Sequence, residues 1–314
     1  MISRRNIERQ SKMSKNSNYI LLLPILSGIL FGSAGVFVRT FTEFGMSNPT
    51  LIFLRTSIAS IFLFILILCT DKSRLKVKLR DFPLFIGTGL IAMLGVNLCY
   101  NYAVNTLSLS LAAVLLSTSP IFVLIIAAIL FKEKITKKKV IGAALAIIGC
   151  LLSTGILENV GSTNLSSLGI FLGICSAVFY GLYSIISRIA TDRGYHTYTI
   201  IFYSVLLIAI ALIPFVQFDI AANYVAVAPA WHTVVLILHA LCTSVLPYVF
   251  LTYALMHAEA GTVSILASGG EPVSAAVFGV IVYSEIPSLL MILGLAIVIY
   301  ALVLLCQTPK QATE

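Results

Sequence analysis

The chain has 314 residues, of which 59% are hydrophobic and only 10% are charged. A water-soluble globular protein needs more polar surface than this, so that class is excluded and an integral membrane protein is indicated. The net charge of +8 lies in short segments between apolar stretches, which marks membrane topology and argues against a nucleic-acid partner.

The first half of the chain is expected to form five membrane-spanning helices. Residues 82–131 contain no Asp, Glu, Lys or Arg, and as one helix they would be about 75 Å long, more than twice the thickness of the hydrocarbon layer. They must therefore form two helices, and residues 105–108 are the natural turn between them. The other apolar stretches of this half lie at residues 19–38, 49–70 and 140–155.

The second half of the chain repeats this pattern. An offset of 152 superposes Pro120 on Pro272 and Glu133 on Glu285, and an offset of 149 superposes Gly45 on Gly194. We therefore predict two diverged copies of one unit. The helices expected in the second copy lie at residues 168–187, 196–215, 231–256, 260–284 and 287–306.

The predicted fold is an all-α integral membrane protein with ten transmembrane helices in two five-helix repeats. Because each repeat has an odd number of helices, the second repeat must insert upside down relative to the first, which makes an inverted repeat. The expected segments are a cytoplasmic tail (1–18), the first repeat (19–157), an external linker (158–167), the second repeat (168–306) and a cytoplasmic C-terminal tail (307–314).

The basic residues set the expected orientation. With the N-terminus inside, the cytoplasmic segments hold 18 of the 20 Lys and Arg residues, and only Arg39 and Arg55 lie elsewhere. An excess of Lys and Arg marks cytoplasmic segments, so both termini are predicted to be cytoplasmic. The short loops fit a multi-pass protein of a bacterial plasma membrane.

Glu271 is the sharpest candidate for a functional residue. It is the only charged residue between Ala260 and Ser284, so it would lie near the bilayer midplane, where a charge costs at least about 2.5 kcal/mol. Two interpretations stay open. Glu271 either binds a cationic substrate group or a proton, or it is a hydrogen-bonded carboxyl that holds the helix in place.

Residues around Glu271 predict an interruption of its helix, since glycine tolerates irregular dihedrals and proline removes a backbone donor. These residues are Gly269, Gly270 and Pro272. Pro120, which follows Ser119, predicts the equivalent interruption in the first repeat.

Arg55 is the second charged candidate, about seven residues into its helix. It either points into a central cavity, where it would pair with Glu271 or clamp a substrate carboxylate, or it reaches back to the membrane surface. Other polar and aromatic residues of the apolar stretches are predicted to line the same cavity, although each tyrosine or histidine also fits ordinary helix packing. They are Asn97, Tyr100, Asn101, Ser117, Ser119, Tyr180, Tyr183, His239, Tyr248 and Ser268.

Nothing in the sequence supports catalysis. We find no nucleophile with a base beside it, no metal-ligand spacing and no glycine-rich phosphate loop, so no enzyme activity, metal or cofactor is expected. The six cysteines lie in or beside apolar stretches without a C-x-x-C motif, and we interpret them as small core residues.

Paired motifs in both copies point to a family. The chain has Phe53-Leu54-Arg55 in its second helix, Ser119-Pro120 and Glu271-Pro272 in the middle of two helices, and Glu133 and Glu285 at their ends. Tyr102-Ala103 and Tyr253-Ala254 end the third and eighth helices. With this order and spacing, the chain from Tyr19 to Cys306 resembles the EamA-type permeases of the drug/metabolite transporter superfamily.

The resemblance implies ten helices around a central cavity and alternating access by movement of the two halves. The implied function is a secondary transporter, with export favoured, of a small polar metabolite such as an amino acid, with or without proton coupling. Ser119 stands where such repeats often have glutamate, so at most one of the two symmetric positions carries charge. The alternative is a membrane scaffold whose small-residue faces, Gly28/Gly32 and Gly169/Gly173, bind other helices.

Overall fold

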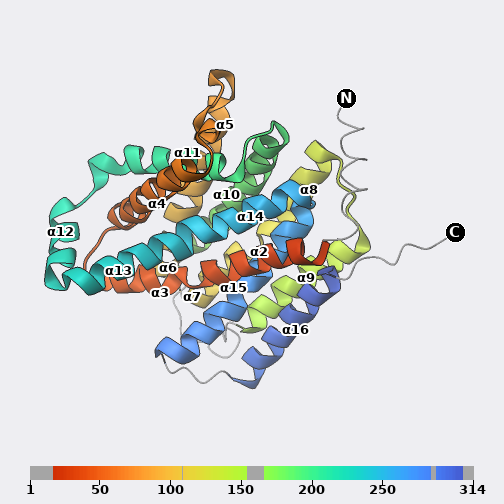
Figure 1. Ribbon diagram of the computed structural model, residues 1–314. Helices are drawn as coiled ribbons and strands as arrows, with labels where there is room; N and C mark the ends of the chain where they lie inside the picture. Colours follow the sequence, from red (N-terminus) through yellow and green to blue (C-terminus); the bar gives the residue numbers. More distant parts are fainter. Residues whose placement is uncertain (1–16, 108, 154–165, 284–287, 307–314) are drawn as a thin grey trace.

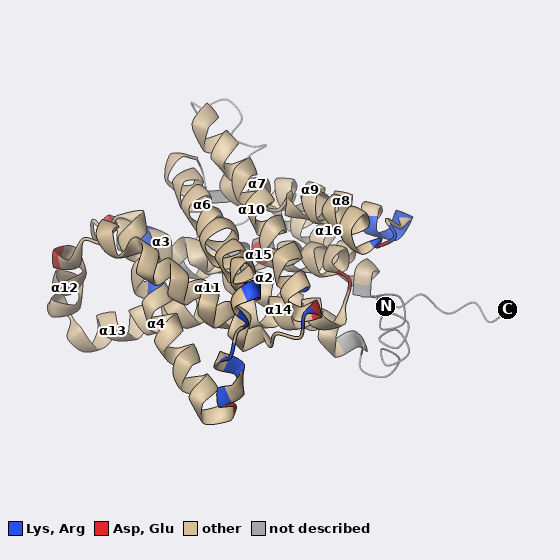
Figure 2. Cartoon of the chain, turned by 90° about the horizontal axis from the view of Figure 1, so that it is seen from above, with Lys and Arg blue, Asp and Glu red and all other residues tan. Residues whose placement is uncertain are grey.

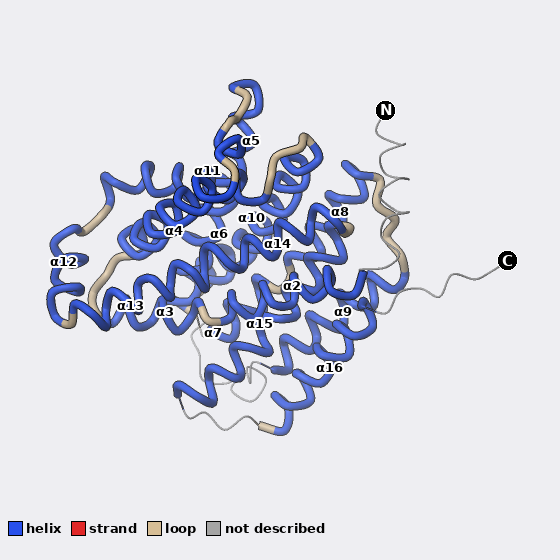
Figure 3. Tube along the Cα trace, viewed as in Figure 1, coloured by secondary structure: helices blue, strands red, loops and turns tan. Residues whose placement is uncertain are grey.

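The computed structural model describes residues 17–107, 109–153, 166–283 and 288–306, and all regular structure in these ranges is helical (Figure 3). The predicted linker (158–167) lies almost wholly outside the described residues, as do Glu285, nearly all of the N-terminal tail and the whole C-terminal tail. An all-helical architecture suits a bilayer, because a helix satisfies every backbone polar group within one segment.

The first half of the described chain contains the elements up to the gap after residue 153. They are α2 (Ser17–Gly32), α3 (Ala34–Glu43), α4 (Asn48–Thr70), η1 (Lys72–Leu75), η2 (Leu79–Asp81), α5 (Phe82–Ile86), η3 (Gly87–Met93), α6 (Leu94–Thr106), α7 (Leu109–Leu116), α8 (Ser119–Phe131) and α9 (Lys137–Ser153).

The second half follows the same plan and adds one short helix outside the expected spans, α12. Its elements are α10 (Ser167–Asp192), α11 (Thr197–Leu212), η5 (Ile213–Phe215), α12 (Phe218–Val227), α13 (Pro229–Ala240), η6 (Leu241–Val245), α14 (Leu246–His257), α15 (Ala260–Tyr283) and α16 (Leu289–Cys306).

Seven helical stretches among the described residues are long and apolar enough to cross a membrane. Helices α9 and α15 pack beside them, and α16 packs on α9 and α15. The seven stretches are Tyr19–Glu43, Asn48–Thr70, Leu79–Thr106, Ala112–Phe131, Ser167–Asp192, Thr197–Phe215 and Pro229–His257.

The stretch around Glu271 differs from its predicted form. Helix α15 runs without a break from Ala260 to Tyr283, so the expected interruption at Gly269, Gly270 and Pro272 is wrong. The glycines serve packing instead, because a Cβ at Gly270 would lie 2.4 Å from the Ile25 carbonyl oxygen on α2 and one at Gly269 would lie 2.6 Å from Leu302 on α16. Proline is tolerated inside a membrane helix when neighbouring helices support the backbone.

The equivalent stretch of the first half is interrupted. Helix α7 ends at Leu116, residues 117–118 form a turn, and α8 begins at Ser119 with Pro120 in its first turn. Proline fits there because the first-turn N–H groups of a helix have no partner within the helix. Ser119 and Glu271, which the offset of 152 superposes, therefore differ in backbone conformation as well as in charge.

One turn has the same geometry in both halves. Gly45 and Gly194 both adopt positive φ, 94° and 92°, which glycine does without steric cost. Their amides donate to the carbonyls of Thr42 and Thr191 at 2.9 and 3.0 Å. The offset of 149 thus superposes residues with the same conformation.

The helices pack mainly across the two halves. Helix α2 lies along α15 and α9 along α16 (Figure 1), while α4 packs on α11 and α6 on α10. A second shared feature is a π-helical segment within the third long helix of each half, η3 and η6. Such segments occur frequently at functional sites.

The charged residues of the described chain gather mostly in loops at helix ends, after α4 and after α8 (Figure 2). One of these loops is tied to the turn before α11, where the Asp81 carboxylate pairs with Arg193 and accepts a hydrogen bond from Tyr195 at 2.8 Å. The basic segment 71–81 and Arg193 therefore lie on the same side of the molecule.

Candidate functional site

Arg55 is buried in the interior of the helix bundle, with only 3% of its surface exposed. Helix α4 carries it, and its guanidinium donates to the Asn97 side-chain oxygen on α6 and to Thr243 Oγ1 in η6 at 3.4 Å. Its Nε is buried without a hydrogen-bond partner. The side chain thus points inward, which is one of the two orientations that the sequence left open, and does not reach the membrane surface.

Both direct partners of Arg55 are neutral and are fixed by their own helices. Asn97 donates to the Met93 carbonyl at 2.6 Å and Thr243 donates to the His239 carbonyl at 2.6 Å. Met93 belongs to η3 and Thr243 to η6, so both π-helical segments contribute to this site. A buried cation without an anionic partner is costly, which favours a functional reason for it.

Glu271 lies in the same interior with 6% of its surface exposed. Tyr100 on α6 donates its hydroxyl to Glu271 Oε1 at 3.5 Å. Within the described residues Glu271 and Arg55 form no ion pair with each other, so the direct pairing that the sequence left open is not made in this conformation.

Helix α6 connects the two charged residues. Asn97 contacts Arg55 and Tyr100 contacts Glu271, and three residues of helix correspond to about 4.5 Å of axial rise. The opposite charges therefore flank a single turn of α6.

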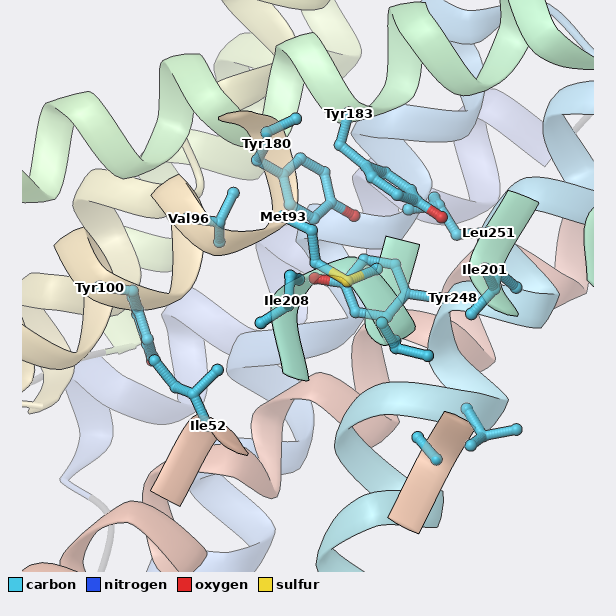
Figure 4. Close-up of a cluster of buried hydrophobic side chains, with 14 of the residues drawn as sticks. Ile52, Met93, Val96, Tyr100, Tyr180, Tyr183, Ile201, Ile208, Tyr248 and Leu251 are labelled. Carbon is cyan, nitrogen blue, oxygen red and sulfur yellow. The ribbon is translucent and has the colours of Figure 1, made fainter. Parts of the chain in front are cut away.

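Three of the predicted tyrosines form a cluster beside this turn, with Tyr180 and Tyr183 on α10 pointing toward Tyr248 on α14 (Figure 4). The rings of Tyr183 and Tyr248 are 4.8 Å apart in a T-shaped arrangement. Phe31 on α2 packs edge-on against Tyr180 and Tyr248. Tyr183 also shares a hydrogen bond of 2.8 Å with Thr252.

His239 is completely buried, and neither ring nitrogen has a hydrogen-bond partner. Its ring stacks on Phe37 at 5.0 Å and lies 5.1 Å from Phe41, both on α3. We did not predict these two phenylalanines or the contact of Thr243 with Arg55. The sequence did contain a signal for them. Phe37 and Phe41 are four residues apart, as are His239 and Thr243, and residues at this spacing lie on the same face of a helix.

The remaining predicted residues are buried polar groups of the same region. Asn101 Nδ2, Ser117 Oγ and Ser119 Oγ have no hydrogen-bond partner, and neither does Ser264 Oγ on α15. Ser268 instead donates to the Ser264 carbonyl of its own helix at 3.0 Å. Buried polar atoms are rarely left without partners, so this group has free capacity for water or a ligand.

At the end of α15 near the basic loops, ion pairs fix the turn that precedes the helix. The Glu133 carboxylate accepts from the amides of Ala260 and Gly261 at 2.8 and 3.3 Å, and the buried Lys139 ammonium lies 2.7 Å from Glu259. A carboxylate at a helix N-terminus is favoured by the unpaired amides there. Glu133 is therefore a helix cap and not part of the polar interior.

The small-residue faces of the scaffold alternative are occupied within the chain. A Cβ at Gly28 would lie 1.9 Å from the Ala267 carbonyl oxygen, and one at Gly32 would lie 1.8 Å from Ser274 Oγ. Gly169 and Gly173 face α6 and α7 in the same way, with Thr106 and Leu115 at 2.6 and 2.4 Å. None of these four glycines is available to a partner helix.

An all-helical membrane bundle with opposite charges buried at its centre defines a class, that of polytopic transport proteins. The profile of the EamA-like transporter family matches residues 18–155 and again residues 167–307. The chain belongs to this family and is a multi-pass membrane protein.

Two transporter relatives agree with this assignment, and a solved structure shares the fold. The chain is 26% identical over 292 residues to the pseudopaline exporter CntI of Pseudomonas aeruginosa (strain UCBPP-PA14), which covers 92% of this chain and 96% of the relative. It is 27% identical over 201 residues to the uncharacterized transporter YyaM of Bacillus subtilis, covering 62% and 64% of the two chains. One crystal structure superposes with a TM-score of 0.71 at 16% identity, over 91% of this chain and 96% of the other, and shows the same fold.

Proposed function

We propose that the protein is a secondary transporter that exports a small zwitterionic metabolite of the amino-acid type. The observation that carries this proposal is the pair of opposite buried charges, Arg55 and Glu271, on either side of one turn of α6. A substrate carboxylate would replace the neutral partners of Arg55, whose planar guanidinium binds carboxylates through two parallel hydrogen bonds. The substrate ammonium would bind Glu271. The name of the exporter relative supports the direction.

The proposed mechanism is alternating access between two inverted five-helix repeats, residues 19–157 and 168–306, with ten spans and both termini in the cytoplasm. The family profile matches twice, at nearly these ranges, and the helices pair mainly across the halves. Arg55 and Glu271 are almost completely shielded from solvent, so the conformation described corresponds to a closed stage of the cycle. Opening to either face requires the halves to move apart.

Proton coupling is assigned to Glu271 in this proposal. Its carboxyl is buried, with Tyr100 as hydrogen-bond donor, so we assign the exchanged proton to this carboxyl, which would release it to bind the substrate ammonium. Export would then exchange substrate for a proton at the same oxygen atoms.

Transport into proteoliposomes with an imposed pH gradient tests the assignment, using a panel of labelled amino acids. We expect accumulation driven by the gradient in the wild type, its loss in Glu271→Gln, and a rise of about tenfold or more in apparent KM in Arg55→Ala, which corresponds to the loss of a charge-assisted hydrogen bond. Asp219→Asn, which removes an exposed carboxylate on α12, is the matched control. If both site variants, folded and inserted, transported the panel as the wild type does, the site assignment would be wrong.

A further inference from the structure

A second candidate ligand site lies away from the central charges, between α3, α12 and α13. It is a pocket with a volume of about 510 Å³. Its lining includes Phe37, Glu43, Phe44, Tyr224, Trp231 and His232. The helices that form it lie away from the basic loops after α4 and α8 (Figure 2).

The aromatic rings of the pocket hold one another in place. Tyr224 and His232 stack with their centroids 4.0 Å apart and their planes at 10°, and the His232 Nδ1 contacts the Tyr224 carbonyl oxygen. Phe44 meets Tyr224 edge to face at 4.9 Å and His232 at 6.2 Å. Only 3% of Tyr224 is exposed, so its ring is anchored in the protein. The pocket therefore has ordered aromatic walls.

The charge of the lining selects among possible ligands. Glu43 is exposed and supplies a carboxylate, while none of the lining residues is a Lys or Arg. A carboxylate near several aromatic rings is the arrangement that attracts organic cations, because the face of each ring carries partial negative charge, most strongly in Trp. A ligand without positive charge would form no ion pair with Glu43.

We propose that this pocket binds an organic ammonium group. Such a group comes from one of two sources, a free metabolite or the head group of a choline or ethanolamine lipid, and the chemistry of recognition is the same for both. The volume suits a head group or a small amine, since ligand pockets start at roughly 300 Å³.

The pocket also contacts the central site through one aromatic residue. Phe37 lines the pocket and stacks on His239, whose carbonyl accepts the hydrogen bond of Thr243, a partner of Arg55. A ligand in the pocket could therefore shift Arg55 through Phe37, His239 and Thr243. The proposal does not depend on the proposed transport function, because the pocket residues differ from Arg55 and Glu271 and because ligand binding is measured directly.

Trp231 is the only tryptophan of the chain, so its intrinsic fluorescence reports on the pocket alone. We would titrate the protein in phosphatidylglycerol vesicles, which contain no other tryptophan, with choline and, separately, with 3,3-dimethyl-1-butanol, its neutral isostere. We expect a saturable fluorescence change with choline and binding at least about tenfold weaker for the isostere, in the range of a desolvated cation–π contact. Equal responses to both compounds would show an apolar interface only and overturn the proposal, as would no response to choline.

Two variants and a matched control sharpen the test. Glu43→Gln and Phe44→Leu should each weaken choline binding about fivefold, as expected for the loss of one ion pair or one ring face. Asp219→Asn removes a carboxylate on the first turn of α12, outside the lining, and should leave binding unchanged. If Asp219→Asn weakened choline binding as much as Glu43→Gln, the weakening would come from long-range electrostatics, and the assignment of the ligand to this pocket would be wrong.

Lipid composition distinguishes the two sources of the ligand. If free choline gives the same response in phosphatidylcholine and phosphatidylglycerol vesicles, the site serves a free amine. If phosphatidylcholine by itself shifts the fluorescence and removes the response to choline, the site holds a lipid head group. Both results support an ammonium site.

Discussion

At the scale of single residues, Arg55 is a buried cation held by an amide and a hydroxyl. Removal of these partners would leave the guanidinium charge without a hydrogen bond in a medium of low dielectric constant. Asn97 is the critical partner because its orientation is fixed by its own bond to the Met93 carbonyl.

We expect Asn97→Ala to lower the free energy of unfolding by about 2 kcal/mol, the size of a lost hydrogen bond to a charged group. Asn105→Ala, at an exposed position near the end of the same helix, should change it by less than about 0.5 kcal/mol. Denaturant unfolding in detergent, followed by circular dichroism, measures both. Equal effects of the two substitutions would mean that the bond to Arg55 contributes nothing to stability.

At the scale of helices, the close contact of α2 with α15 depends on glycine. Gly28 lies so near the Ala267 carbonyl oxygen that a methyl group would overlap it at 1.9 Å, whereas a Cβ at Gly181 on α10 would have its nearest neighbour, Phe122 Cβ, at 3.4 Å. Small residues let membrane helices approach closely, since van der Waals packing supplies much of their attraction in lipid.

Gly28→Ala should therefore destabilise the protein by about 1–3 kcal/mol through overpacking. Gly181→Ala has room for its methyl group and should be neutral or stabilising by up to about 1 kcal/mol, because alanine is the better helix former. Thermal unfolding in detergent compares the two. A Gly28→Ala protein as stable as Gly181→Ala would show that α2 can move away from α15 without cost.

At the scale of the whole molecule, the basic segment 71–81 and the turn before α11 are joined by the Asp81 contacts with Arg193 and Tyr195. These two charged regions come from different halves of the chain, and their contact places them on one face. The positive-inside rule predicts that this face is cytoplasmic.

Labelling of single cysteines in a background without the six native ones tests this orientation. A membrane-impermeant maleimide should modify Asp219→Cys in intact cells and Ser73→Cys only after permeabilisation, since both side chains are exposed on what we predict to be opposite faces. A green fluorescent protein fused after Glu314 should fluoresce in cells. The opposite labelling pattern would reverse the topology.

Composition and periodicity were sufficient to predict the helical class and most helix positions. The structure has the helices of both halves within a few residues of the expected ranges, because long uncharged stretches must satisfy their backbone inside the bilayer. Arg55 points inward and Glu271 is buried, whereas the sequence left the direction of Arg55 open. Helix α12 was missed, because its ten residues are too few to span a membrane.

Local sequence failed where packing decides the backbone. Gly269, Gly270 and Pro272 have the composition of a helix break, yet α15 is continuous, since α2 and α16 pack against its glycines and support it. At Ser117 and Thr118, where the local signal is weaker, the helix is interrupted. Proline and glycine allow an interruption, but the neighbouring helices determine whether it forms.

The sequence by itself determined that this is a helical membrane protein with two similar halves and with an acid and a base in its apolar stretches, because hydrophobicity, charge and spacing are properties of the chain. Only the tertiary structure decided that Arg55 faces Asn97 and Thr243, that Glu271 faces Tyr100, and that one turn of α6 lies between them. These contacts join residues 42 to 188 positions apart. Contacts of that range depend on how the helices pack, which local patterns do not specify.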